Sequence, residues 1–153
     1  MFSDGPSFVD YWRKVRARTI RVFERIPADD LEWTHLPGKY TFGDVFRHLP
    51  GIERYMYGET VQQRPSAYPG HSVELARGPE AIRAWMDRCH AESLAIFSAL
   101  TPEDLAVKCR TPAGTPISTR MGVPGAIAGC ARTAVASGAR AMPPSAASMR
   151  RRL

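Results

Sequence analysis

The chain has 153 residues, which is enough for one domain with a hydrophobic core and too few for two. Its net charge of +6 does not indicate a nucleic-acid-binding surface, because the arginines of residues 121–153 supply nearly all of it and residues 1–120 are close to neutral. The spacing of the three cysteines excludes a disulfide framework or a zinc knuckle, and no apolar stretch could span a membrane, so we expect a cytoplasmic protein without a membrane partner.

Three segments carry apolar residues at the spacing of an amphipathic helix. Residues 8–26 alternate steps of four and three along the positions Phe8, Trp12, Val15, Thr19, Val22 and Ile26. Residues 42–60 follow the same rule, with Thr41 as the expected N-cap and Asp44 at the position of a capping box. Residues 80–100 form the third segment. We expect three helices of one bundle, whose buried side chains include Trp12, Val45, Leu49, Met86 and Ile96.

Turn-forming residues separate these helices and follow the last one. Residues 61–78 carry two prolines and two glycines, which predicts a long connection rather than a regular element. Residues 108–119, KCRTPAGTPIST, are also rich in proline and glycine and end in Ser-Thr, the expected cap of a fourth helix. The predicted fold is all-α: a four-helix bundle with residues 1–120 as its body and a weak or degraded fourth helix in residues 121–153.

The composition of residues 121–153 differs from that of the rest of the chain. This tail contains no aromatic or acidic residue and no histidine, but nine alanines. A helix that seals a bundle needs large apolar side chains, which the tail lacks. Gly122, Gly125 and Gly129 weaken its first turns further, by about 1 kcal/mol for each interior glycine relative to alanine. We therefore expect either a weak fourth helix or a disordered segment.

Two interpretations account for the tail: a natural low-complexity segment, or a GC-rich gene read out of frame. We favour the second. A shift by one base turns the codons of Met121 and Gly122 into a codon for tryptophan. The same shift permits His-Glu within residues 131–133 and His-Arg-Gly within residues 136–139. The shifted frame would thus supply the aromatic and histidine side chains that the tail lacks.

Residues 42–59, FGDVFRHLPGIERYMYGE, carry the most informative motif. With FVDYWRKVRARTIRVFERIP before it and TPAGTPIST after it, the sequence resembles the DinB/YfiT-like family of metal-dependent four-helix bundles over residues 8–119. In that family one histidine of the second helix and two of the fourth bind a divalent metal, zinc or nickel. The resemblance implies that His48 is a metal ligand. The other two ligands have no counterpart, because all the histidines precede residue 91: His35, His48, His71 and His90.

The resemblance also implies a metal-dependent transferase or hydrolase of the thiol-transfer type, acting on a small thiol or another small molecule. Because one imidazole cannot hold the metal alone, we expect metal binding to be weak or absent and the activity impaired. The catalytic residues are unknown. The alternative is a metal-free helical module that acts by association, as a homodimer, without catalysis. For His48 itself, the alternative to a former ligand is a core histidine that is hydrogen-bonded to a neighbour.

Other reactive side chains are weaker candidates. Glu53 could face the same pocket as His48, although a Glu-Arg pair on a helix is more often solvated. Pro50 lacks a backbone donor and should bend the helix near His48. Cys89 and His90 are adjacent and point about 100° apart, so we interpret both as structural. We assign no role to the remaining candidates, which are Cys109 in a loop and the two surface histidines, His35 and His71.

Overall fold

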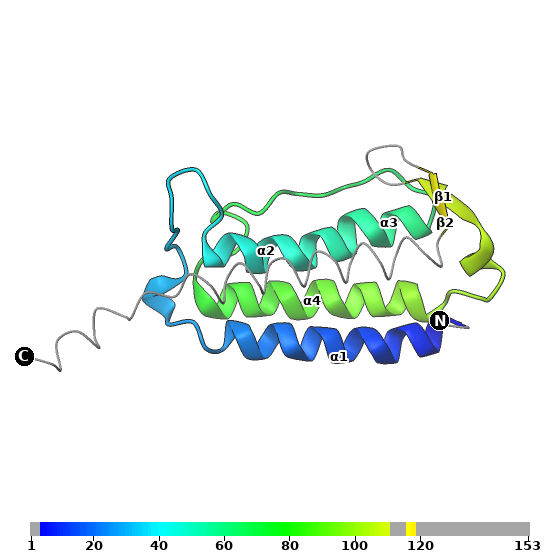
Figure 1. Cartoon of the computed structure of the whole chain (residues 1–153), viewed down its shortest axis with the longest axis horizontal. Coiled ribbons are helices and arrows are strands. Elements are labelled where there is room, and N and C mark those ends of the chain that lie inside the picture. The colour runs from blue at the N-terminus through cyan, green and yellow to red at the C-terminus, as the bar shows by residue number, and fades with distance from the viewer. Residues whose placement is uncertain (1–3, 111–115, 119–153) are drawn as a thin grey trace, which may run out of the picture.

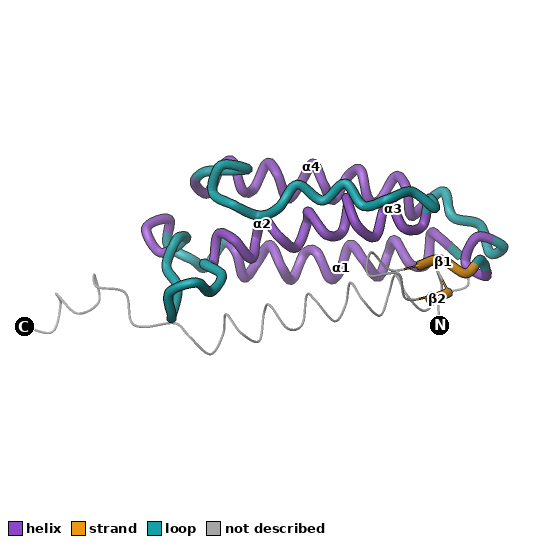
Figure 2. The backbone as a smooth tube through the Cα atoms, turned by 90° about the horizontal axis from the view of Figure 1, so that it is seen from above, coloured by secondary structure: helices purple, strands orange, loops and turns teal. Residues whose placement is uncertain are grey.

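The computed structural model describes residues 4–110 and 116–118. Its elements follow in the order α1 (Gly5–Phe23), a 3-10 turn (Ala28–Asp30), α2 (Phe42–Ile52), a π-helix (Glu53–Tyr57), α3 (Gly58–Val61), α4 (Gly78–Ser98), a second 3-10 turn (Asp104–Ala106), β1 (Lys108–Arg110) and β2 (Pro116–Ser118). The long helices run side by side, and α4 packs against both α1 and α2 (Figures 1 and 2). The predicted helical fold is confirmed, while the tail and the fourth helix expected in it lie outside the described residues.

Helices α1 and α2 each begin at a residue whose side chain caps the helix, and the sequence analysis predicts the second of these caps. Asp4 caps α1, because its carboxylate accepts a hydrogen bond from the backbone N–H of Ser7 at 2.8 Å. Thr41 and Asp44 form the predicted capping box of α2. The hydroxyl of Thr41 accepts from the N–H of Asp44 at 2.9 Å, and the carboxylate of Asp44 accepts from the N–H of Thr41 at 3.0 Å. Each bond satisfies a backbone donor that the first turn of a helix leaves unpaired.

The second predicted helix, residues 42–60, changes type along its length. The α-helix continues past Pro50, although this residue has no backbone N–H to donate, and ends at Ile52. It then widens into the π-helix Glu53–Tyr57 before the short helix α3 begins. A π-helix has more residues per turn than an α-helix, so it changes the direction in which the following side chains point. The apolar stripe of α2 therefore does not continue unbroken into α3.

Two hydrophobic clusters form the core between the helices. The larger contains Phe23, Leu31, Phe46, Ala76, Ile82, Trp85, Met86 and Cys89, and the smaller contains Phe8, Val9, Trp12 and Phe97. Of the five residues predicted to be buried, Trp12, Leu49 and Met86 are buried, whereas Val45 and Ile96 are half-buried. Phe46 is buried beside Val45, so the inward face of α2 is rotated from the predicted stripe. No helix within the described residues is both long and apolar enough to cross a membrane.

Strands β1 and β2 form a short antiparallel hairpin that the sequence analysis does not predict. Cys109 pairs with Ile117 in its register, and Arg110 with Pro116. The proline and glycine content of the segment suggests a loop, but Pro116 is the first residue of its strand, a position at which proline is tolerated. The hairpin follows the second 3-10 turn and lies at the end of the bundle where α1 begins (Figure 1).

Candidate functional site

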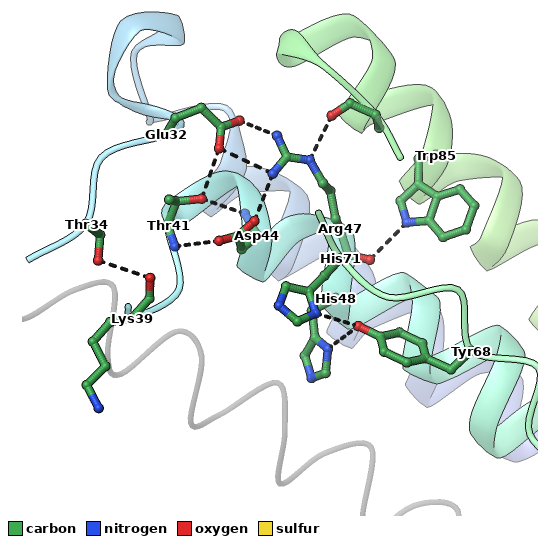
Figure 3. Close-up of polar contacts among 11 residues, drawn as sticks. Glu32, Thr34, Lys39, Thr41, Asp44, Arg47, His48, Tyr68, His71 and Trp85 are labelled. Atoms are coloured by element: carbon green, nitrogen blue, oxygen red, sulfur yellow. Dashed lines mark hydrogen bonds and ion pairs between the residues drawn. The ribbon is translucent and has the colours of Figure 1, made fainter. Parts of the chain in front are cut away.

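His48 lies on α2 and faces the connections beside the bundle rather than the core clusters. Its side chain is half-buried, and its Nδ1 atom lies 2.6 Å from the hydroxyl oxygen of Tyr68. The same oxygen lies 3.0 Å from Nδ1 of His71. The three side chains meet at this hydroxyl (Figure 3). His71 is therefore half-buried beside His48, and its assignment as a surface residue is wrong.

Tyr40 completes a group of four rings, which we call the His48 cluster (Tyr40, His48, Tyr68 and His71). The centroid of the Tyr40 ring lies 4.3 Å from that of His71 and 5.4 Å from that of His48. The centroids of the two imidazoles are 5.5 Å apart. Tyr40 precedes α2, whereas Tyr68 and His71 belong to the connection between α3 and α4. The cluster thus joins two loops to the surface of α2.

The protonation states in the cluster follow from burial. Burial lowers the pKa of His48, and the neighbouring His71 lowers it further, so that the His48 imidazole is neutral at pH 7. Burial also raises the pKa of Tyr68 to about 12, so its hydroxyl keeps its proton. That hydroxyl has one proton to donate, and therefore it donates to one imidazole and accepts from the other when both rings are neutral. The proton positions on the two histidines are coupled through Tyr68.

Arg47 fastens both loops of the cluster to α2. Its side chain is fully buried, and Nε donates to the backbone carbonyl of Ala76 at 2.7 Å. Its guanidinium forms ion pairs with Glu32 and with Asp44, the latter at 3.1 Å. Figure 3 shows the bonds from Arg47 to Glu32 and Asp44. Glu32 belongs to the segment that leads to Tyr40, and Ala76 lies near the end of the connection that carries His71. Sequence reasoning missed Arg47, whose position beside His48 gives no sign of these long-range partners.

Gly51 allows Tyr68 to lie against α2. A Cβ atom at residue 51 would come within 2.9 Å of Cε2 in the Tyr68 ring, which is closer than carbon atoms approach without moving. The helix therefore presents bare backbone where the tyrosine ring crosses it. Gly70, with a φ of 89°, supplies a left-handed turn between Tyr68 and His71. The sequence YPGH at residues 68–71 carries this turn signal, and it was the available clue that these two side chains are close.

Glu53 belongs to a separate, buried polar group with Arg16 and His90. Its side chain is 0% exposed, Oε1 lies 3.0 Å from Nδ1 of His90, and Oε2 forms an ion pair with Arg16. Both expectations for Glu53 are wrong, because it is neither a solvated residue nor a neighbour of His48. Within the described residues, Nε of Arg16 and the indole N–H of Trp12 have no hydrogen-bond partner.

Charge in this buried group is set by desolvation. Burial lowers the pKa of His90 to about 4, and the positive charge of Arg16 acts in the same direction. The imidazole is therefore neutral at pH 7, and its Nδ1 proton is donated to the Glu53 carboxylate. Burial lowers the pKa of Arg16 to about 10, which leaves the guanidinium charged. The group thus holds a buried ion pair with a neutral histidine at its edge.

The cysteines offer no activated thiol among the described side chains. Cys89 is buried in the core, and burial raises the pKa of its thiol to about 12, so it is uncharged at pH 7. This agrees with its interpretation as a structural residue. Cys109 lies in β1 and Cys130 in the tail, and both side chains lie outside the described part of the structure.

The donor set does not fit the three-ligand metal centre that the resemblance implies. All the histidine, aspartate and glutamate residues of the chain lie between residues 4 and 104. Among the described residues, no three side chains of histidine, cysteine, aspartate or glutamate form a group that could hold a metal ion. His48 is accompanied in its cluster by one other histidine, His71, and by two tyrosines.

Comparison with known families and proteins adds one match. The family model described as the DinB superfamily matches residues 11–132. The match covers most of the span 8–119 over which the sequence carries the resemblance, and it continues past Arg120 into the tail. No curated protein matches the chain.

Proposed function

Because the chain belongs to the DinB superfamily, we propose that it has the scaffold of a metal-dependent transferase or hydrolase of the thiol-transfer type, in which the metal centre is incomplete. The position of His48 supports this proposal. It lies at the matching place on the second long helix, half-buried, with its ring held by the Tyr68 hydroxyl. A metal-binding histidine is commonly held in this way, through the ring nitrogen that does not bind the metal.

The number of available ligands carries the proposal that the centre is incomplete. A catalytic zinc-type site uses three protein ligands and keeps one position open. The tail supplies no histidine or carboxylate that could join His48, since it contains none. We therefore expect little thiol transfer from the chain as it stands.

The test compares the purified full-length chain with a re-encoded chain whose reading frame is shifted by one base after the codon of Arg120. We expect elemental analysis of the present chain to find well under one zinc or nickel ion per molecule and a thiol-transfer assay to find little activity. The shifted frame should raise metal content and activity together. One tightly held metal ion per molecule in the present chain that is retained when His71 is replaced by glutamine would contradict the proposal.

The substrate and the partners of this scaffold are also part of the proposal. A small thiol is the expected co-substrate, because thiol transfer is the chemistry that the resemblance implies. The alternative, a metal-free module that associates as a homodimer, predicts a different measurement. Sedimentation of the full chain at several concentrations should give the mass of a monomer if the scaffold is an enzyme remnant and that of a dimer if association is its role.

A further inference from the structure

Two imidazole nitrogens of the His48 cluster converge on one point. Nδ1 of His48 and Nδ1 of His71 lie 2.6 Å and 3.0 Å from the hydroxyl oxygen of Tyr68. The two imidazole rings are nearly perpendicular, with an interplanar angle of 82°. Two ring nitrogens that point at one position from different directions have the arrangement of a pair of metal ligands. Figure 3 shows both rings directed at the hydroxyl.

The chemistry of the donors selects the class of cation. Imidazole nitrogen is a good ligand for zinc, copper and nickel, whereas magnesium and calcium prefer oxygen. A zinc–nitrogen bond is about 2.0–2.1 Å long. Since the present distances to the hydroxyl are 2.6 Å and 3.0 Å, each ring needs to approach by only about 1 Å or less for an ion to take the place of the oxygen.

We propose that His48 and His71 form a two-imidazole site for a divalent cation such as Zn²⁺ or Cu²⁺, centred where the Tyr68 hydroxyl now lies. Water fills the remaining coordination positions, and the hydroxyl moves aside. The site differs from the family-type centre of the proposed function, in which Nδ1 of His48 holds the Tyr68 hydroxyl, Nε2 is left for the metal, and the other ligands come from the fourth helix. Here the second ligand comes from the connection between α3 and α4.

Metal entry requires one proton to change place. When both rings are neutral and the hydroxyl lies between them, one imidazole carries its proton on Nδ1 and the other carries it on Nε2. With the ion between them, both Nδ1 atoms present lone pairs and both protons are on Nε2. One ring therefore exchanges its Nδ1 proton for an Nε2 proton through solvent, and the cluster releases no proton overall. The ion binds both imidazoles in the neutral form, which is the form in which histidine binds metals.

Both ligands are held near the site before the ion arrives. Arg47 bonds the loops of Tyr40 and His71 to α2. Gly51 has no side chain, which leaves room for the Tyr68 ring to lie beside His48. The ring of Tyr40 contacts both imidazoles. Because the ligands are ordered in advance, less conformational entropy is lost when an ion binds.

This site shares His48 with the family-type centre, but it can be tested apart from the proposed function. It uses no residue of the tail, and it concerns binding of added metal rather than thiol transfer. If the protein binds Zn²⁺ through His48 and His71 but transfers no thiol, the result supports this inference and does not contradict the proposed incomplete family-type centre. A chain that transfers thiols as isolated contradicts the proposed function whatever His71 does.

The affinity test titrates Zn²⁺ into the purified full chain in competition with a chromophoric chelator. The variants His48→Gln and His71→Gln should each bind Zn²⁺ at least about 10-fold more weakly than the unmodified chain, since losing a ligand weakens binding no less than losing a residue that hydrogen-bonds to a ligand. The matched control is His35→Gln, because His35 is a loop histidine that is exposed and lies outside the cluster. That variant should bind Zn²⁺ with unchanged affinity. If His71→Gln binds as tightly as the unmodified chain, or the unmodified chain binds no Zn²⁺, the inference is wrong.

Two further measurements identify the centre. Tyr68→Phe removes the competing hydroxyl and keeps the ring, so this variant should bind Zn²⁺ with equal or higher affinity. A lower affinity would indicate that the Tyr68 oxygen is itself a ligand, and it would contradict the proposal that the ion takes the place of the hydroxyl. Long-range ¹H–¹⁵N spectra should show Zn²⁺ shifting the Nδ1 resonances of His48 and His71 together. A shift confined to the Nε2 resonances, or to one histidine, would overturn the proposed site.

Discussion

Nε of Arg47 donates a hydrogen bond of 2.7 Å to the carbonyl oxygen of Ala76, 29 residues further along the chain. This bond joins the middle of α2 to the end of the connection that carries Tyr68 and His71. Arg47 adjoins His48 in sequence, yet its side chain is fully buried among the segments that hold the cluster in place. The placement of the imidazoles therefore depends on a residue whose side chain binds Glu32, Asp44 and the Ala76 carbonyl.

Replacement of Arg47 by lysine should destabilise the protein. Lysine cannot bridge Glu32, Asp44 and the Ala76 carbonyl together, because it lacks the planar fork of arginine. We expect the free energy of unfolding to fall by about 1.5–3 kcal/mol, the range for hydrogen bonds to charged groups. The loss should not be larger, because Glu32 is 45% exposed and water can solvate it.

Urea denaturation measures this change, with Arg13→Lys as the matched control. Arg13 also pairs with an acidic residue, Asp10 at 3.1 Å, but both side chains are largely exposed. Its replacement should change the free energy of unfolding by less than about 0.5 kcal/mol. Equal effects at the two arginines would mean that Arg47 does not hold the loops together.

Replacement of Gly51 by alanine should disturb the His48 cluster without a large loss of stability. The new Cβ would lie 2.9 Å from the Tyr68 ring, so this ring must move and its bond to His48 must lengthen. The strain is offset by the helix propensity of alanine, which exceeds that of glycine by about 1 kcal/mol. The ¹⁵N resonances of the His48 ring report the change.

Gly58→Ala is the control for this substitution. Its Cβ would meet the flexible end of Ile96 at 3.3 Å, and none of its three nearest atoms belongs to a residue of the His48 cluster. The His48 resonances should stay the same in this variant and shift in Gly51→Ala. Unchanged resonances in both variants would show that Tyr68 is not seated on residue 51.

The helices and their caps could be predicted from the sequence because local spacing determines them. The capping box of Thr41 and Asp44 is an example, since both partners lie within one turn. Long-range pairs carry no such local signal. Glu53 precedes an arginine, which suggests a solvated pair, yet its partner is Arg16, 37 residues earlier.

Of the residues in the candidate site, only His48 could be predicted from the sequence. His48 stands out because of its motif, whereas His71 becomes a neighbour only through the path of a loop with proline and glycine. Tyr68 and Gly51 were not predicted for the same reason, because their contact depends on how that loop crosses α2. Spacing along a helix gives no information on such a crossing.

Acid should weaken the protein through His90. The pKa of this buried imidazole in the folded protein is about 4, below its ordinary value of 6.5. Between these values the unfolded chain binds a proton that the folded chain does not, so the free energy of unfolding falls as the pH drops from 6.5 toward 4. The total loss from this group is on the order of 3 kcal/mol.

Urea denaturation at pH 7, 6, 5 and 4 tests this dependence. The variant His90→Gln keeps a polar side chain near Glu53 but cannot take up the proton, so its stability should fall less over this interval. Carboxylates contribute in both proteins, and the difference between the two curves isolates His90. Parallel curves would contradict the assignment of a buried, neutral imidazole.

Removing one partner of the ion pair between Arg16 and Glu53 should lower the free energy of unfolding strongly, whereas replacing both residues should lower it much less. Both side chains are buried, with 5% and 0% exposure, so the removal of one partner leaves an uncompensated charge away from water. Glu53→Met alone should lower the free energy of unfolding by about 3–5 kcal/mol, and Arg16→Met alone by a similar amount. The double variant replaces the pair with apolar side chains of similar size, and its loss should be much smaller than the sum, because a buried ion pair contributes little net stability over a well-packed apolar pair. A double-mutant cycle by urea denaturation measures the coupling, and additive losses would show that the two charges do not interact in the folded protein.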